Sequence, residues 1–559
     1  MIGVLLQATP SPSPTPAPLG ANVIGFSFLL SLMVWGPAVV AVITAVTPEP
    51  GSARRLPWGL AFWTTLGVLV LAIAGYSQFQ SFTTGLQFEE RMPWMPRLGV
   101  SYHLGVDGIS MALLVLNGLV FLCAVLASWE IRERGRQYFS LLLFAEAAAN
   151  GVLAAQDAFL LLLFWAAGIL PVALLVAGWA GARGPAAAAR LAAFWGAGTA
   201  TLLVAVLLLY DAAGASSFDL GTLAKPAATV VQVLVGVALT VTAATRLPLV
   251  PGHGWVREAV AEAPAGVAIL TMGAVSRLGG YLLVRLLAGA EPSGARALAP
   301  YLGALAALTA IYAVVAASSA RDLRRLATYL ALLPGSVTVL GVAGLTPLSL
   351  DGTVVLLFGG GLAAALVVGA AITLAERAQA RELGVAAGLA GRAPKLVWLL
   401  LTGGLAVLGM PFLATFPGAL MVFLGSFRTQ VWAAFVVGAG LVLGGVAVAR
   451  LMHRVAFGAP NPDAPSPGDS SLAESWCLGV LVGALLWVGL VPSGPKLFGN
   501  PIFLDQGLIN VVNSPTADLA APYAPPAPPS PKPSPSASPA PSPSASPSAS
   551  PAPSPSPSP

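Results

Sequence analysis

The sequence has few charged residues. Asp, Glu, Lys and Arg make up 9% of its 559 residues, and the mean hydropathy is +0.83. Soluble domains average roughly 25% charged residues, so the composition excludes a water-soluble enzyme. The net charge of +5 comes from cations spread over short segments between apolar runs, and it does not indicate a nucleic-acid surface. The chain is therefore predicted to be a polytopic membrane protein.

Cysteine and histidine are also scarce. The two cysteines, Cys123 and Cys477, lie in apolar runs, so they predict neither a disulfide framework nor a metal site. The three histidines lie in separate loops or at the ends of spans: His103, His253 and His453. Neither a glycine-rich nucleotide loop nor a nucleophile elbow is found in its required context. The sequence predicts no catalytic residue of a soluble active site, no metal and no cofactor bound to this chain.

Long apolar runs make up most of the sequence. About 20 residues cross a bilayer as a helix, and the runs predict about 14 such helices near residues 22–47, 58–77, 106–127, 138–155, 157–179, 191–210, 228–250, 264–287, 299–319, 326–344, 353–375, 396–427, 429–449 and 473–492. Prolines break the seventh span at Pro248 and Pro251, and the twelfth at Pro411 and Pro417. Because the two breaks lie five spans apart, they favour a transporter built from two repeats over a chance distribution of proline.

The loops between these spans differ in their content of Lys and Arg. The odd-numbered loops hold 17 of these cations and the even-numbered loops hold 5. Cytoplasmic loops carry the excess of positive charge, so the odd loops are predicted to be cytoplasmic and both termini to lie on the outer face.

The stretch from residue 242 to 264 combines several features that are unusual within a membrane. Arg246 lies in the apolar run before Pro248 and Pro251, and His253 follows. An ionisable group beside a helix break at membrane depth indicates a functional site; the alternative is a loop at the end of a helix with an arginine that reaches the interface. The candidate residues of an ion path are Glu146, Asp157, Arg246, Arg277 and His253.

Charge is distributed unequally between the two breaks. The residues above all lie in the first half of the chain. In the second half the spans between residues 326 and 375 hold no charge, since Asp351 is assigned to a loop, and residues 396–427 contain no Asp, Glu, Lys, Arg or His.

Several motifs point to one family. They are SYHLGVDGIS from Ser101, RLPLVPGHGW from Arg246, EAP from Glu262, RDLRRLATY from Arg321, GMPFLATFPGALMVFLGSF from Gly409, and Phe164-Trp165 followed by Ile169-Leu170-Pro171. Over about residues 98–455 the chain resembles the antiporter-like subunit M of bacterial NADH:quinone oxidoreductase, respiratory complex I. The related subunit of Mrp-type cation/proton antiporters shares the fold and stays an alternative.

The resemblance implies an all-α membrane protein with 14 helices, two inverted five-helix repeats, and broken seventh and twelfth helices. It implies proton translocation coupled to quinone reduction, with NADH, FMN, Fe–S clusters and quinone held by partner subunits. The partners are the other membrane subunits of such a complex, and the place is the bacterial inner or plasma membrane. The chain itself is then a non-redox subunit of a translocase.

The resemblance also divides the chain into segments. They are an N-terminal Pro/Ser-rich segment, the first three helices, a first and a second antiporter-like repeat, the last helix with its flanks, and a Pro/Ser/Ala tail: residues 1–21, 22–137, 138–287, 288–455, 456–513 and 514–559. The tail has too few apolar side chains to form a core, so it is predicted to be disordered.

At the positions that carry protons in the family, this chain departs from the pattern. Glutamate is replaced by Ala166, two lysines by Arg246 and Arg277, two histidines by Pro334 and Gly360, and an acid by Ala419. Glu146 and Asp157 match family acids in the fourth and fifth spans, and His253 and Glu262 match the loop after the seventh.

These replacements act against proton transfer. A relay group must gain and lose protons near neutral pH, and arginine is not deprotonated in proteins. We therefore expect an impaired proton path, and a non-pumping structural paralogue is the further alternative. Arg246 or Arg277 is predicted to pair with Glu146, directly or through water; otherwise each group reaches a hydrated pocket or the interface.

Overall fold

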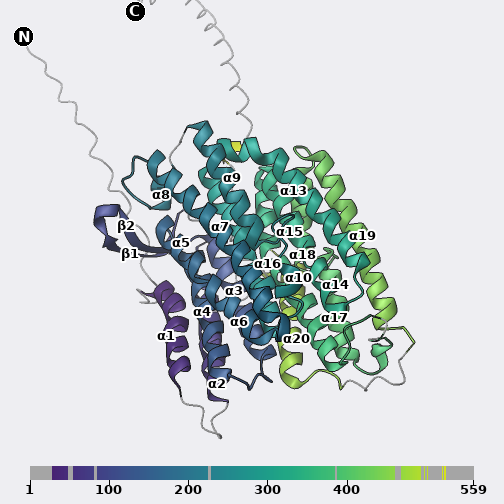
Figure 1. Ribbon diagram of the computed structural model, residues 1–559. Helices are drawn as coiled ribbons and strands as arrows, with labels where there is room; N and C mark the ends of the chain where they lie inside the picture. The colour runs from purple at the N-terminus through teal and green to yellow at the C-terminus, as the bar shows by residue number, and fades with distance from the viewer. Residues whose placement is uncertain are drawn as a thin grey trace, which may run out of the picture. The chain divides into compact units, whose positions relative to one another are not determined.

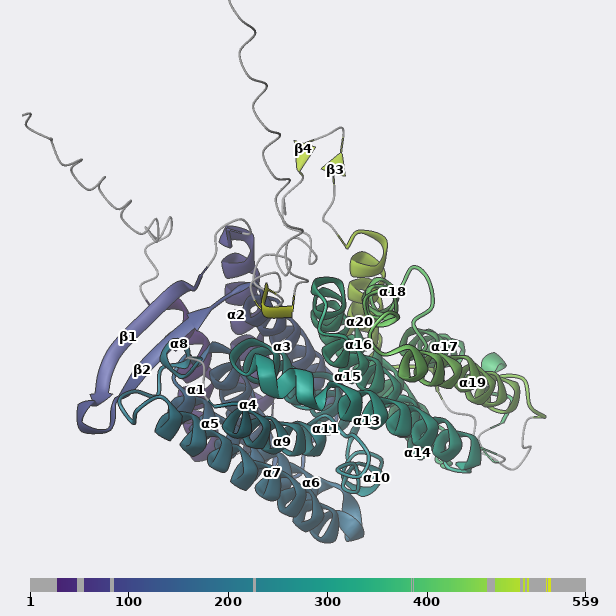
Figure 2. The same cartoon turned by 90° about the horizontal axis from the view of Figure 1, so that it is seen from above.

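The computed structural model describes residues 28–47, 55–80, 85–224, 228–383, 385, 387–459, 468–492, 496–497, 500–501, 519 and 521–523. Within these ranges the chain is a bundle of helices that run side by side (Figure 1) and are seen nearly end-on from above (Figure 2). The predicted all-α membrane fold is confirmed. The predictions for residues 1–21, and for most of residues 514–559, lie outside the described residues.

The helices match the predicted spans. Twelve of them are long and apolar enough to cross a membrane, and α4 and the α17–α18 pair occupy the two remaining predicted spans. The spans in chain order are α1 Leu29–Val46, α2 Leu56–Gln78, α3 Gly108–Ala127, α4 Gly135–Ala154, α5 Ala158–Ala167 with α6 Ile169–Trp179, α7 Gly184–Ala212, α9 Thr229–Arg246, α11 Ala265–Leu270 through η3 Thr271–Val275 and α12 Arg277–Leu282 to η4 Leu283–Ala288, α13 Pro292–Ser319, α14 Leu323–Leu330 with α15 Leu333–Gly344, α16 Pro347–Arg377, α17 Pro394–Val407 with α18 Thr415–Ser426, α19 Val431–Val455 and α20 Leu472–Leu490. The inverted relation of the two repeats stays a prediction.

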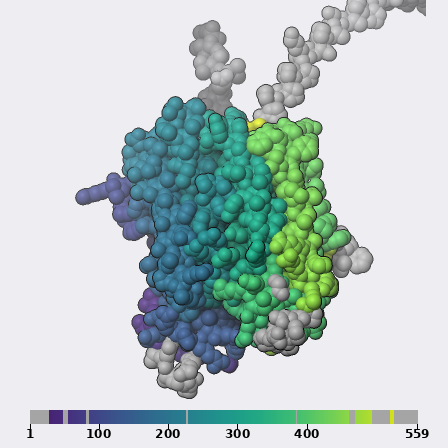
Figure 3. Space-filling view, turned by 45° about the vertical axis from the view of Figure 1, so that its right-hand side comes forward, coloured from purple at the N-terminus to yellow at the C-terminus, as the bar shows by residue number. Residues whose placement is uncertain are grey.

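Burial distinguishes central from peripheral helices. Nearly all residues from α11 to η4 and most residues of α16 are buried, whereas α2, α7 and α20 bury about a third of their residues or less. Peripheral helices expose large apolar side chains such as Trp63 and Val442, as a surface in contact with lipid requires. Figure 3 shows one side of the bundle, on which the helices of the middle of the chain (blue to teal) lie beside the later ones (green to yellow).

Proline sets where three helices stop. A proline in a helix removes the hydrogen bond to the residue four positions earlier and clashes with its carbonyl. Accordingly α5 ends at Ala167 before Pro171, α14 ends at Leu330 before Pro334, and α17 ends at Val407 before Pro411, each four residues ahead of the proline. The breaks in the fifth and tenth spans were not expected from the sequence.

The two predicted breaks are both present. After α9 the chain passes Pro248, Pro251 and the short α10 (Val256–Ala259) before the next span begins. In the twelfth span α17 and α18 are separated by residues 408–414, and Thr415 Oγ1 donates to Ala406 O at 2.6 Å across the gap. The prediction that Pro417 lies in this break is wrong, because Pro417 is the third residue of α18. A proline there removes no hydrogen bond, since the first N–H groups of a helix have no partner within the helix.

A β-hairpin that the sequence did not indicate connects α2 and α3. Strand β1 (Gln87–Met95) pairs antiparallel with β2 (Val100–Val106) and lies beside the bundle (Figure 2). The Glu90 carboxylate accepts from Leu30 N at 2.8 Å and so satisfies a free amide at the start of α1. His103 O accepts from Gln156 N at 2.9 Å. The hairpin thus ties together the chain segments at one end of the bundle.

The loops gather at two ends as the Lys and Arg count predicts. Glu262 of the seventh loop contacts Arg183, Arg325 and Arg381, which belong to other odd-numbered loops. Asp219 of an even loop contacts His103 and Arg91 of another. The grouping of the loops is confirmed, and which end faces the cytoplasm stays a prediction.

The described chain also includes short elements. These are η1 Pro96–Leu98, η2 Gly181–Arg183, α8 Leu220–Leu223, η5 Leu389–Gly391, β3 Lys496–Leu497 paired with β4 Asn500–Pro501, and η6 Ala521–Tyr523. Leu519 and Tyr523 of η6 pack against the bundle, and the expected disorder of the tail from residue 514 stays a prediction. Both bring apolar or aromatic side chains that the rest of the tail lacks.

Candidate functional site

Arg246 is the last residue of α9 and is almost fully buried, with 1% of its surface exposed. Its guanidinium carbon lies 4.7 Å from the ring centre of Trp165 and 4.1 Å from that of Trp195. Nη2 donates to Trp165 O at 2.6 Å. A cation over an aromatic face is attracted by the ring quadrupole, more strongly when water is excluded. Two indoles from α5 and α7 thus hold this charge without a carboxylate.

A third indole stabilises the end of α9. Trp255 lies edge-on to Trp195, with the ring centres 5.2 Å apart, and its Nε1 donates to Thr245 O at 2.7 Å. The last carbonyls of a helix lack partners within it, so this hydrogen bond caps the break beside Arg246. The loop after the seventh span therefore positions the cation as well as interrupting the helix.

Arg277 begins α12, between two π-helical turns, and is 2% exposed. Nε donates to Met272 O and to Ser276 Oγ, each at 3.2 Å. Among the residues described, neither Nη1 nor Nη2 has a hydrogen-bond partner. A cavity of about 10 Å³ adjoins the side chain, lined also by Asn117 and Leu153, and this is room for about one water molecule.

Gly360 lies between Pro334 and Arg277. A Cβ placed on Gly360 would be 2.8 Å from Pro334 Cβ and 3.7 Å from Arg277 Nη1. A Cβ on the neighbouring Gly361 would lie 3.3 Å from Arg277 Cγ. The structure thus brings together Arg277, Pro334 and Gly360, three of the positions that the resemblance assigned to the proton path. Gly360 and Gly361 have no side chain, and this leaves room for the arginine at position 277, which is bulkier than a lysine.

Glu146 lies on α4 and is fully buried. Neither carboxylate oxygen has a hydrogen-bond partner, and no described Lys or Arg nitrogen lies within ion-pair distance. The predicted direct pairing with Arg246 or Arg277 is therefore wrong, because Trp165 and Trp195 surround one guanidinium and small or apolar residues surround the other.

One turn beyond Glu146, Asn150 joins three helices. It accepts from Asn117 Nδ2 at 2.7 Å and donates to Met33 O at 2.9 Å. Asn117 also lines the cavity beside Arg277. Asparagine is a common residue, so the sequence alone does not single out Asn117 and Asn150. Their hydrogen bond in the structure shows that they belong to the polar interior.

Asp157 is an anchoring residue in this structure. One carboxylate oxygen accepts from Phe159 N and Leu160 N at 3.0 and 3.1 Å and caps α5, and the other accepts from Ser101 N of β2 at 2.9 Å. Burial raises the pKa of Asp157, and these hydrogen bonds counteract the rise. These hydrogen bonds give Asp157 a structural role, which requires no part in proton transfer.

His253 and Glu262 lie in the loop after the seventh span. The His253 ring is half-buried, with its centre 4.2 Å from the ring centre of Tyr312, and burial lowers its pKa and so favours the neutral imidazole. The Glu262 side chain is 8% exposed, and Arg381 Nη1 approaches it to 2.5 Å. This end of the bundle is held by ion pairs, in contrast to the interior around Arg246.

The second break has apolar and hydroxyl side chains around it. Ala419 of α18 is buried and packs near Gly409, and Ala166 is the second-last residue of α5, where its carbonyl accepts from Gly168 N. Asp351 was placed in a loop from the sequence, but it lies in the second turn of α16, because that helix begins at Pro347. Lys395 lies in the first turn of α17, and the rest of α17 together with α18 contains no charged residue.

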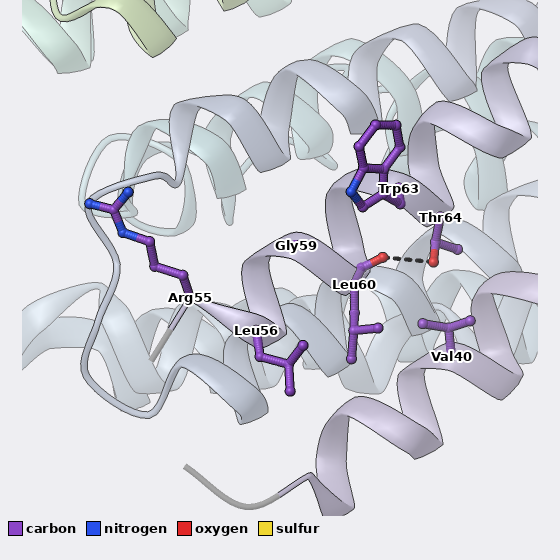
Figure 4. A pocket seen from close by; sticks show the side chains of 7 residues that line it. All are labelled: Val40, Arg55, Leu56, Gly59, Leu60, Trp63 and Thr64. Carbon is purple, nitrogen blue, oxygen red and sulfur yellow. Dashed lines mark hydrogen bonds between the residues drawn. The ribbon is translucent and has the colours of Figure 1, made fainter. Parts of the chain in front are cut away.

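A groove on the lipid-facing side is separate from these residues. It lies between α1 and α2 and is lined by Val40, Arg55, Leu56, Gly59, Leu60, Trp63 and Thr64 (Figure 4). Thr64 Oγ1 donates to Leu60 O of its own helix at 2.7 Å. The candidate residues above do not line it.

Comparison with known proteins identifies the family. Residues 155–444 match the model of the family described as NADH:quinone oxidoreductase/Mrp antiporter, transmembrane. The chain belongs to the NADH:quinone oxidoreductase/Mrp antiporter family. The matched range begins just before Asp157 and includes both broken helices, so it covers the motifs of the resemblance except the one from Ser101.

Relatives extend the match over most of the chain. NAD(P)H-quinone oxidoreductase chain 4 of Acaryochloris marina is 29% identical over 478 residues, covering 83% of this chain and 89% of that protein. NAD(P)H-quinone oxidoreductase chain 4 1 of Synechococcus sp. (strain JA-3-3Ab) is 30% identical over 442 residues, covering 78% and 83%.

Solved structures share the fold of this antiporter-family chain. A chain of respiratory complex I from Thermus thermophilus with bound NADH superposes with a TM-score of 0.77 at 25% identity, covering 88% of this chain and 99% of the other. A chain of the Mrp complex from Dietzia sp. DQ12-45-1b gives a TM-score of 0.74 at 21% identity, covering 89% and 98%. The latter likeness concerns the fold alone.

Proposed function

We propose that this chain is the antiporter-like membrane subunit of an NADH:quinone oxidoreductase-type complex and takes part in proton translocation coupled to quinone reduction. The observation that carries the proposal is the likeness over 99% of a chain of respiratory complex I. The relatives named NAD(P)H-quinone oxidoreductase chain 4 support it. The other membrane subunits of that complex are the partners.

In this proposal the chain is a non-redox subunit of the enzyme. NADH, FMN, Fe–S clusters and quinone belong to partner subunits. The protein lies in the bacterial inner or plasma membrane, with both termini on the outer face, as the 17 to 5 distribution of Lys and Arg between the two sets of loops favours.

We further propose that proton transfer through this subunit is impaired. Arg246 is held between two indoles and cannot release a proton at neutral pH. Arg277 faces Gly360 and Pro334, which offer no proton acceptor in their side chains. Ala166 and Ala419 lack any ionisable group. The subunit then transmits or supports a conformational change in the complex, which is the role of a structural paralogue.

The membership is tested by purifying a tagged chain from its host membranes. Quinone-reducing activity and other subunits co-purify with it if the proposal holds. An Mrp-type assembly, which the likeness to the Dietzia structure keeps as the second candidate, instead purifies without that activity and exchanges a cation for protons in vesicles.

The impaired path is tested on the number of protons moved per quinone reduced by the complex. Arg246→Gln and Glu146→Gln should leave that number unchanged. The double variant Ala166→Glu with Arg246→Lys places a carboxyl and a lysine at the first break. Its control, Ala166→Gln with Arg246→Lys, keeps the lysine and replaces the carboxyl by a neutral amide. A loss of translocated protons in Glu146→Gln, with quinone reduction intact, would contradict the impaired path while leaving membership of the complex untouched.

A further inference from the structure

The loop between η4 and α13 holds a carboxylate with no partner. Glu291 directly precedes α13 and is fully buried. Neither oxygen has a hydrogen-bond partner in the described part of the chain. An isolated ionised carboxylate is costly to bury, whereas its neutral form is far less so. This residue lies outside the path discussed above and has no role in it.

The C-terminal segment packs on this same loop. Tyr523 donates its hydroxyl to Ala288 O at 2.8 Å. Arg296 donates to Pro522 O, and its guanidinium lies 5.3 Å from the centre of the Tyr523 ring. A Cβ on Gly289 would lie 2.6 Å from Leu519 Cδ2. The segment is the short yellow piece at the upper end of the bundle in Figure 1.

The charged groups here respond to one another. Burial raises the pKa of Glu291 to about 7. Burial also raises the pKa of Tyr523, the charge of Glu291 adds to that rise, and the Arg296 cation acts against it. On the α9 side the neighbour is neutral, since Gln232 accepts from Ser293 N at 2.9 Å. Arg296 is engaged by the C-terminal segment and forms no ion pair with Glu291 among the described contacts.

We infer that the loop from Ala288 to Arg296 is a docking site for the chain's own C-terminal segment, and that protonation of Glu291 closes it. Docking keeps water from the loop and so favours the neutral carboxyl. In the open state Glu291 titrates near 4.5, its ordinary value, and in the closed state near 7. Docking is therefore strongest below pH 4.5, weakens as pH rises through this window, and levels off above pH 7.

This device concerns the end of the bundle that the even-numbered loops share. On the orientation in the proposed function that end faces the compartment that receives protons, so accumulation of protons would close the latch. The docking equilibrium itself depends on neither the orientation nor translocation, and it can be measured on the purified chain.

The experiment places the photoreactive residue p-benzoylphenylalanine at position 519 of the full-length protein in nanodiscs. Cross-links to residues 288–296 are quantified by mass spectrometry from pH 4.5 to 8.5, because the photochemistry does not require a thiolate. The yield should fall at least about tenfold across this range, within the roughly 300-fold limit set by the two pKa values. Glu291→Gln should give a high yield that does not change with pH.

Two further variants make the result specific. Glu133→Gln, a change of an exposed glutamate at the opposite end, should keep the wild-type profile. Tyr523→Phe removes the hydroxyl bonded to Ala288 O and should lower the yield at every pH without moving the midpoint. Absence of cross-links to the loop at all pH values overturns the docking site, and a pH profile unchanged in Glu291→Gln overturns its control by this residue. Co-purification with quinone reductase is unaffected by either outcome.

Discussion

The two breaks share a backbone design and differ in chemistry. At the end of α9, a buried arginine is enclosed by Trp165 and Trp195. Between α17 and α18, a hydroxyl of Thr415 bridges the gap, and Ala419 occupies the position where the sequence resemblance implies an acid. Broken helices are therefore maintained by proline and local hydrogen bonds, whereas the charge beside a break is independent of the break itself.

The comparison also separates two ways of keeping a charge in a membrane. Arg246 has aromatic faces and a carbonyl as partners, and Arg285 of the same half forms an ion pair with Asp107 and a 2.8 Å hydrogen bond to Gln156 Oε1. Arg277 has only two acceptors for Nε and an adjoining cavity. The three arginines thus differ in how strongly the fold depends on them.

Breaking the aromatic enclosure should give the largest effect. Trp195→Ala leaves a cavity and exposes one face of the Arg246 guanidinium to apolar surroundings, and we expect a loss of about 3–5 kcal/mol in the free energy of unfolding. Trp398→Ala is the matched control, because that indole is 64% exposed on the lipid side, and it should cost far less. The measurement is unfolding of the purified protein in mixed micelles at increasing SDS.

Trp195→Phe sharpens this test, since it keeps an aromatic face but reduces its size. The free energy of unfolding of Trp195→Phe should lie between those of the wild type and of Trp195→Ala. Equal losses for Trp195→Ala and Trp398→Ala would mean that the enclosure contributes nothing to stability.

Placing a histidine at position 360, in the half of the chain with few charges, should also lower the free energy of unfolding, but by less than Trp195→Ala. A Cβ on Gly360 meets Pro334 Cβ at 2.8 Å, so Gly360→His overpacks the core, and we expect a loss of about 1–3 kcal/mol. Gly445→Ala is the control, because its Cβ would meet its nearest neighbour at an ordinary 3.9 Å. The same SDS titration measures both variants.

The double variant Gly360→His with Pro334→Gly removes the obstructing Cβ of residue 334 and should recover part of the loss. A single Gly360→His variant as stable as the Gly445→Ala control would show that the second half accepts a histidine without repacking.

The sequence was sufficient for the helices but not for the contacts between them. Apolar runs placed all fourteen spans, and prolines placed both breaks, because each is a local property of the chain. The contact of Arg246 with Trp165 and Trp195 joins residues up to 81 positions apart, and a single sequence gives no distance between them. The assumed partner Glu146 was chosen by charge alone, whereas the structure uses indole faces.

Other misses have local causes. The hairpin from Gln87 to Val106 is short and lacks a regular alternation of apolar and polar residues, since β1 is mostly exposed. The apolar run that begins at residue 353 predicts Asp351 in a loop, whereas α16 starts earlier because Thr346 caps it by accepting from Ser349 N. Glu291 precedes a helix in a short loop, and its sequence context does not indicate that the side chain is buried.

The smallest expected effect concerns Arg277, and its sign distinguishes it from the paired arginine of the same span. Replacing a poorly paired buried charge by an apolar side chain of similar length is often neutral or stabilising, so Arg277→Met should change the free energy of unfolding by on the order of 1 kcal/mol or less, toward greater stability. Arg285→Met is the control, because it leaves Asp107 buried without its cation, and it should destabilise the protein. If Arg277→Met destabilises as much as Arg285→Met, the cavity beside Arg277 supplies a partner of comparable strength. In that case Arg277 is a charge that the stability of the bundle requires. It is then not merely a residue left from a former proton path.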